Sequence, residues 1–222
     1  CIDMEHGMNS YQKMLDLIRT ADYYGITPIV RTRGISRSAI LKPADAGAGG
    51  IIVPMVRDVN NVKQIIEYGK YNPLGQRGMC PNRCSDYGEK STIKNRPFTE
   101  YFLEENEHFL VLPQCETKEF LQVADEILFM PGVDGTMIGP HDLAISMGHP
   151  GDIFCMEVRQ AMMEVLKKCK EYNKLSMIAC SEVNHAREYL KLGFDAVIFG
   201  LESSLLINWY RSLLEQIKEE NK

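Results

Sequence analysis

Short runs of apolar, often β-branched residues alternate with longer amphipathic stretches along the whole chain. Seven such runs predict strands, at residues 1–4, 28–31, 51–54, 109–114, 135–138, 176–179 and 196–199. Between them, apolar residues recur at helical spacing over residues 11–24, 59–70, 155–172, 182–192 and 205–219. A strand followed by a helix, repeated along the chain, is typical of a parallel sheet with crossover helices.

The seven predicted strands are one fewer than a closed (β/α)₈ barrel requires. The first of them begins at Cys1, with no strand and helix before it. We therefore expect a TIM barrel that lacks its first βα unit, either because the sequence is truncated at its N-terminus or because its numbering begins after an absent segment. A length of 222 residues fits one domain, so residues 1–222 are predicted to form a single barrel domain.

Composition and charge exclude several classes of partner. The 25 Lys and Arg residues are outnumbered by 30 Asp and Glu residues, and a net charge of −5 gives no general attraction to nucleic acid or anionic membranes. No apolar run approaches the roughly 20 residues of a membrane helix, and the N-terminus does not resemble a signal peptide. Seven cysteines, an odd number, indicate reduced thiols rather than a disulfide framework. We expect a cytoplasmic protein.

Polar residues interrupt the predicted strands at their C-terminal ends, where barrel enzymes carry their chemistry. Asp3 and Glu5 share one face at the end of the first strand, and His6 follows where the strand becomes a loop. Gln114 and Glu116 share a face at the end of the fourth strand. These residues are candidates for a site at one edge of the sheet.

Glu116 and Asp142 follow consecutive predicted strands, which are often neighbours in a parallel barrel. Their carboxylates could therefore converge on one cation. Carboxylate oxygens suit a hard, six-coordinate ion such as Mg²⁺ or Mn²⁺ better than zinc. The alternative is a pair of solvated surface carboxylates, and spacing alone does not decide between the two.

Seven short motifs stand in order along nearly the whole chain. They are residues 3–7 (DMEHG), 28–31 (PIVR), 45–48 (DAGA), 53–56 (VPMV), 73–78 (PLGQRG), 114–117 (QCET) and 138–143 (IGPHDL). Together they resemble the HpcH/HpaI aldolases, a family that includes 2-dehydro-3-deoxyglucarate and 4-hydroxy-2-oxoheptanedioate aldolases. Each motif alone is weak, but their common order is specific. Members usually begin with a strand and helix before the first motif, in agreement with the missing unit.

The resemblance implies a metal site and a substrate site. Glu116 and Asp142 would hold the metal, expected to be Mg²⁺ or Mn²⁺ with Co²⁺ as an alternative, and Gln114 would lie beside the bound 2-oxo acid. Backbone amides near the start of the helix after the fifth strand would receive the substrate carboxylate. That substrate-binding segment consists of Gly139, Pro140 and His141.

The resemblance also implies three catalytic residues. His6 would act as the base, oriented by Asp45, and Arg31 would face the oxygen that gains negative charge. The activity would be that of a metal-dependent (class II) aldolase, an aldehyde-lyase that cleaves 4-hydroxy-2-oxo acids to pyruvate and an aldehyde through a metal-stabilised pyruvate enolate. The other aldolase chemistry uses a lysine Schiff base. Lys174 precedes its predicted strand and Lys118 lies on the helix side of Glu116, so neither is suitably placed.

Two positions depart from the family pattern. Ala144 stands where the family commonly has serine, which removes a hydroxyl but no proposed ligand. His141 occupies a position that is commonly small, where it could tune specificity or simply face solvent.

Two other functions stay open: a malyl- or citramalyl-CoA lyase of the same superfamily, and a non-catalytic barrel that binds a ligand. The resemblance further implies a homo-oligomer, a hexamer with an exchanged C-terminal helix. An apolar pattern is compatible with this assembly, although it would equally suit packing on the chain's own barrel. It consists of Leu205, Leu206, Trp209, Leu213 and Ile217.

Overall fold

The protein, seen in a computed structural model that describes residues 1–91, 93–94 and 96–219, has an α/β fold built on one parallel sheet. The strands are β1 (Ile2–Asp3), β2 (Ile29–Arg31), β3 (Gly50–Val53), β4 (Leu110–Cys115), β5 (Gly135–Ile138), β6 (Leu175–Cys180) and β7 (Ala196–Phe199). Each strand pairs in parallel with the next along the chain, so all seven predicted strands and their order are confirmed.

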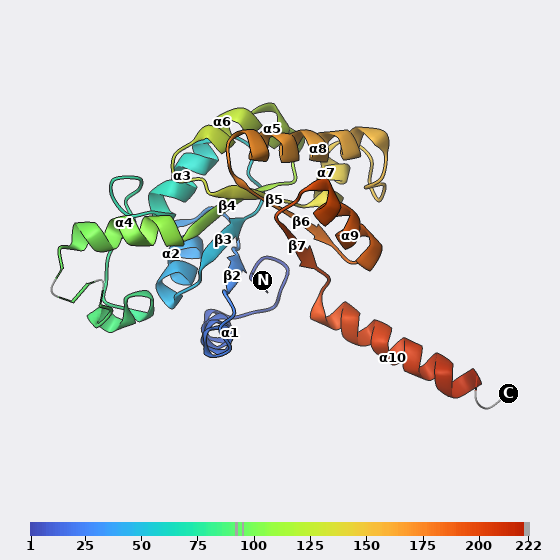
Figure 1. Cartoon of the computed structure of the whole chain (residues 1–222), viewed down its shortest axis with the longest axis horizontal. Helices are drawn as coiled ribbons and strands as arrows, with labels where there is room; N and C mark the ends of the chain where they lie inside the picture. The colour runs from blue at the N-terminus through green and yellow to red at the C-terminus, as the bar shows by residue number, and fades with distance from the viewer. Residues whose placement is uncertain (92, 95, 220–222) are drawn as a thin grey trace.

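The sheet curls, and most of the helices lie along its outer side (Figure 1). They are α1 (Tyr11–Tyr23), α2 (Arg37–Ala46), α3 (Val59–Gly69), the 3₁₀ helix η1 (Arg83–Gly88), α4 (Phe98–His108), α5 (Lys118–Gln122), α6 (Ala124–Phe129), α7 (Pro140–Ser146), α8 (Met156–Glu171), α9 (Val183–Leu192) and α10 (Glu202–Glu219). Strands β1 and β7 form the two edges. The described residues contain no eighth strand that would close a barrel. The curled sheet is therefore an open half-barrel.

The central strands β3, β4 and β5 are buried on both faces, as expected for a parallel sheet covered by helices. Ile51 and Val111 belong to the large core between the sheet and the helices. Ile52 and Leu112, one position further along each strand, form a second apolar layer on the inner side of the curl together with Met137. Since the side chains of a strand alternate between faces, Gln114 lies on the inner face with Leu112, as the sequence predicted.

Local capping signals explain where the helices before the site begin and end. Ser36 accepts a hydrogen bond from the backbone N–H of Ala39 at the start of α2. Gly47 follows α2 in the left-handed conformation, with φ of 90°. This glycine ends the helix and turns the chain into β3, as the glycine-rich segment after α2 indicates.

The C-terminal helix α10 extends away from the rest of the chain (Figure 1). It exposes many large apolar side chains, among them Leu205, Leu206, Trp209, Tyr210, Leu214 and Ile217. Leu213, which the sequence places on the same apolar pattern, is half-buried. Within the described part of the chain, no helix is both long and apolar enough to cross a membrane.

Candidate active site

The C-terminal end of β4 places a buried carboxylate at the inner edge of the sheet. Glu116 follows the last residue of β4 and is only 2% exposed. Its Oε1 accepts a hydrogen bond of 2.6 Å from the backbone N–H of Met55. Its Oε2 accepts a short hydrogen bond from the Gln114 side-chain amide. The carboxylate is therefore fixed from two sides before any ligand is bound.

Two backbone features serve this carboxylate. Met55 has a φ of 57°, a left-handed conformation that costs of order 1–3 kcal/mol in a residue other than glycine and that turns its N–H toward Glu116. A Cβ at Gly139, after β5, would lie 3.0 Å from Gln114 Nε2 and 3.2 Å from Glu116 Oε2, so a side chain there would displace both groups by a few tenths of an ångström. The glycine requirement in the Gly-Pro motif follows from this close approach.

A second acidic group comes from the end of β1. Arg31, the last residue of β2, binds Asp3 with two hydrogen bonds, Nε to Oδ1 at 2.9 Å and Nη2 to Oδ2 at 2.6 Å. Its Nη1 lies 3.4 Å from Oε2 of Glu5. Burial raises the pKa of Asp3, but the bonds from Arg31 outweigh burial and lower it. Asp3 is thus a fixed anion that orients the guanidinium.

The electrostatics of the site favour an additional positive charge. Burial raises the pKa of Glu116, and repulsion from Glu5 and Asp142 raises it further against the hydrogen bonds from Met55 and Gln114. Burial likewise raises the pKa of Glu5, although Arg31 lowers it in part. Neighbouring negative charge thus opposes the ionisation of Glu116 and of Glu5, the situation that a bound cation would relieve.

Two buried polar atoms of the described residues lack a hydrogen-bond partner in this region. They are Oε2 of Glu5 and Oε1 of Gln114. Oε2 of Glu5 still faces Nη1 of Arg31 as an ion pair. Oε1 of Gln114 is therefore the atom of the two that indicates a missing partner, because buried polar atoms rarely remain unsatisfied. The carboxylates of Glu116, Glu5 and Asp142 and the amide oxygen of Gln114 are all oxygen donors. Such a set fits a hard divalent cation that also binds water or a ligand.

The remaining predicted residues follow β1 and β5 and differ in their exposure. The side chain of His6 is 70% exposed, with Nε2 3.8 Å from Oε2 of Glu5. Gly139 and Pro140 are buried, whereas His141 and Asp142, in the first turn of α7, are exposed.

The structure does not bring Asp45 to His6. Asp45 lies near the end of α2, on the side from which β3 begins, whereas His6 follows the C-terminal end of β1. Asp45 accepts a hydrogen bond of 3.2 Å from Arg77, whose buried guanidinium lies over the rings of Tyr71 and Phe109. Asp45, implied by the resemblance as the partner of the base, thus binds the loop that carries Arg77.

The described lysines agree with a site that uses no Schiff base. Lys118 is exposed at the start of α5, and Lys174 donates to the carbonyl oxygen of Val133 before β5. The buried Lys70 had no sequence signal. It is bonded at the N-terminal end of β4, away from Glu116.

One contributor to the site, the Met55 amide, was not among the predicted residues. Glu5 was named for its alternation with Asp3 but received no role, and the structure places its carboxylate beside Arg31. The Met55 amide had no sequence signal, because any residue type offers an N–H and only its left-handed backbone directs it.

Comparison with known proteins gives a consistent result. A family model described as HpcH/HpaI aldolase/citrate lyase matches residues 1–209, which confirms the resemblance drawn from the motifs. A hydroxypyruvate/pyruvate aldolase of Deinococcus radiodurans is 30% identical over 221 residues, which cover 100% of this chain and 78% of that protein. A 4-hydroxy-2-oxo-heptane-1,7-dioate aldolase of Escherichia coli is 31% identical over 213 residues, covering 92% of this chain and 76% of the relative.

A solved structure gives the same fold. The crystal structure of an HpcH/HpaI aldolase from Desulfitobacterium hafniense superposes with a TM-score of 0.89 at 22% identity, over 98% of this chain and 82% of the other. The half-barrel is therefore consistent with a TIM-barrel-like aldolase fold.

Proposed function

Because this chain belongs to the HpcH/HpaI aldolase/citrate lyase family, a family of carbon–carbon lyases, we propose that it is an aldolase that cleaves 4-hydroxy-2-oxo acids to pyruvate and an aldehyde. The observation that carries the proposal is the buried Glu116, fixed by hydrogen bonds and opposed electrostatically by Glu5 and Asp142. A structural carboxylate would instead be paired with a cationic side chain of its own.

Glu116 and Asp142 would hold a divalent cation, with Mg²⁺ and Mn²⁺ preferred for oxygen ligands. When bound, the cation supplies a Lewis acid that draws electron density from the keto group of the oxo acid. Gln114 has a free amide oxygen on the inner face and would orient the substrate beside Glu116. The backbone N–H groups of His141 and Asp142 have no acceptor within α7 and would receive the substrate carboxylate.

Cleavage of the carbon–carbon bond leaves an enolate, so negative charge develops on the former keto oxygen. Arg31 would stabilise that charge, since its guanidinium is held rigidly by Asp3 and interacts electrostatically with Glu116. His6 would accept the proton of the 4-hydroxyl group, because it is accessible and follows β1 at the same edge.

Replacement of His6 by alanine tests this proposal. We expect kcat for cleavage of a 4-hydroxy-2-oxo acid to fall by about 10²-fold, the low end of the contribution of a general base. Cation affinity should be nearly unchanged, since His6 is not a proposed ligand. The assay measures pyruvate release, and His108→Ala, an exposed histidine of α4, is the control. Turnover of the His6→Ala variant at the wild-type rate would refute the assignment of the base.

We also propose that the protein is a homo-oligomer that covers the apolar face of α10. The support is the number of large apolar side chains on a helix that extends from the rest of the chain.

A further inference from the structure

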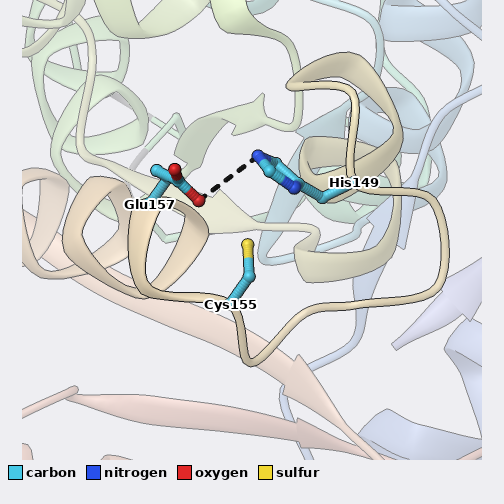
Figure 2. Close-up of side chains that lie close together, drawn as sticks. All are labelled: His149, Cys155 and Glu157. Carbon is cyan, nitrogen blue, oxygen red and sulfur yellow. Dashed lines mark ion pairs between the residues drawn. The ribbon is translucent and has the colours of Figure 1, made fainter.

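A second group of metal-binding side chains lies between α7 and α8, apart from the carboxylates at the end of β4. His149, Cys155 and Glu157 each offer one ligand atom, and these atoms all lie within 4.8 Å of one another (Figure 2). His149 Nε2 and Glu157 Oε2 are 3.4 Å apart. Histidine and glutamate alone would form an ordinary surface ion pair, but the thiol of Cys155 adds a third donor on the same side.

The backbone holds these residues in place. At the end of α7, Gly148 in the left-handed conformation donates to the carbonyl of Ile145, and the N–H of His149 donates to that of Ala144 at 2.8 Å. These two hydrogen bonds form a Schellman motif, which fixes the position of His149 after the glycine.

The other side of the cluster is equally fixed. Cys155 is the N-cap residue of α8, its carbonyl accepts from Arg159, and its side chain packs against the main core. Glu157 lies in the first turn of that helix. Phe154, just before the cap, packs on the ring of His185 from α9 with centroids 4.7 Å apart. The three ligand positions thus come from a turn and a helix start that are both anchored.

The geometry suits a small tetrahedral cation. Zinc binds histidine nitrogen, cysteine sulfur and carboxylate oxygen at about 2.0 to 2.3 Å, which places tetrahedral ligands about 3.3 to 3.8 Å from one another. The distance between His149 and Glu157 already falls in this range. The Cys155 thiol has to approach by a side-chain movement of about 1 Å, estimated from the same ligand spacing.

We propose that His149, Cys155 and Glu157 bind one divalent cation of the zinc class, with the fourth coordination position open to water. On binding, the thiol of Cys155 loses its proton to solvent and the thiolate becomes the ligand. A nitrogen, sulfur and oxygen donor set selects zinc-like ions, whereas the oxygen donors near Glu116 select Mg²⁺ or Mn²⁺. The bound ion would clamp the turn after α7 to the start of α8. Helix α7 begins at the candidate active site, so the clamp would support that site from its far end.

The test is a titration of the full chain, reduced with a phosphine, with Co²⁺ as a probe for zinc. Thiolate ligation of Co²⁺ produces a strong near-ultraviolet charge-transfer band that oxygen ligands do not give, so binding near Glu116 cannot mimic it. We expect this band to grow to a plateau as Co²⁺ is added and to disappear when Zn²⁺ is added in competition. Cys155→Ser should abolish the band, and serine is itself a good N-cap, so the fold should be kept.

Two further variants complete the test. Cys80→Ser, at an exposed cysteine, is the matched control and should leave the band unchanged. Glu157→Gln should weaken Co²⁺ binding by about tenfold or more, a loss that even outer-shell substitutions commonly cause. The proposal would be overturned if the wild-type chain gave no thiolate band, or if the band survived Cys155→Ser.

Discussion

Replacement of Glu116 by glutamine is expected to lower kcat/KM for aldol cleavage by about 10³-fold, which corresponds to about 4 kcal/mol of transition-state stabilisation. The neutral amide keeps the size of the side chain and an oxygen for the Met55 N–H, but it removes the negative charge that would hold the cation. Cation affinity, measured by calorimetric titration, should fall with the activity.

The same substitution should not unfold the protein. Burial raises the pKa of Glu116, so in the cation-free protein the ionised form is disfavoured by folding. The free energy of unfolding then decreases as the pH rises through this raised pKa. A glutamine at this position does not ionise, so the variant should not show that decrease. We expect the melting temperature without cation to stay level or rise. Glu119→Gln, three residues further on, is the control for activity. Wild-type activity in the Glu116→Gln variant would disprove the role of the carboxylate.

Replacement of Lys70 by alanine is expected to lower the free energy of unfolding by about 3 kcal/mol, the low end of the cost of breaking a buried ion pair. The Lys70 side chain is 1% exposed. Its Nζ donates to the carbonyl oxygens of Asn106 and Phe109, both at 2.6 Å, and lies 2.8 Å from Asp134 Oδ2. Burial lowers the pKa of Lys70, and the nearby Asp134 carboxylate offsets part of this effect. Each of the three ammonium protons still has an acceptor.

The loss would come from the groups left behind. Without the ammonium, two buried carbonyl groups lose their donor, and the Asp134 carboxylate keeps only its bond from the Val111 N–H. Phe109 and Asp134 precede β4 and β5, so Lys70 joins the N-terminal ends of two neighbouring strands. We expect the urea midpoint to fall, with an unchanged dependence of the free energy of unfolding on urea concentration. Lys63→Ala, on the exposed side of α3, the helix that ends just before Lys70, should change stability by no more than about 0.5 kcal/mol. Equal effects of the two substitutions would contradict this account of Lys70.

The strand order was largely predictable because each parallel strand is a short apolar run, and amphipathic helical patterns follow five of the seven. The runs that became β3 and β5 are buried throughout, and such runs admit few other structures beside long amphipathic helices. Short helices were harder to find. α5 and α6 have five and six residues and too few turns to show a helical period, so their existence depends on packing beneath the sheet.

The candidate site was predictable where side chains carry the chemistry and follow a strand. Gln114 lies near the end of β4, Glu116 follows that strand, and Asp142 follows β5 in the first turn of α7. Parallel strands bring such residues to one edge of the sheet. The pairing of His6 with Asp45 could not be judged from sequence, because the motif order does not show at which end of a helix a residue meets the sheet. In the structure, Asp45 accepts a hydrogen bond from Arg77, which lies 32 residues further along the chain.

The central claim is that the carboxylates at the end of β4 and the start of α7 hold a divalent cation that promotes enolate formation. The most direct measurement is the exchange of the methyl protons of pyruvate in D₂O, followed by proton NMR with the full chain and Mg²⁺. Rapid exchange that stops when a chelator is added, and that the Glu116→Gln variant lacks, is the predicted result. Exchange that continues unchanged in the presence of chelator would contradict the claim.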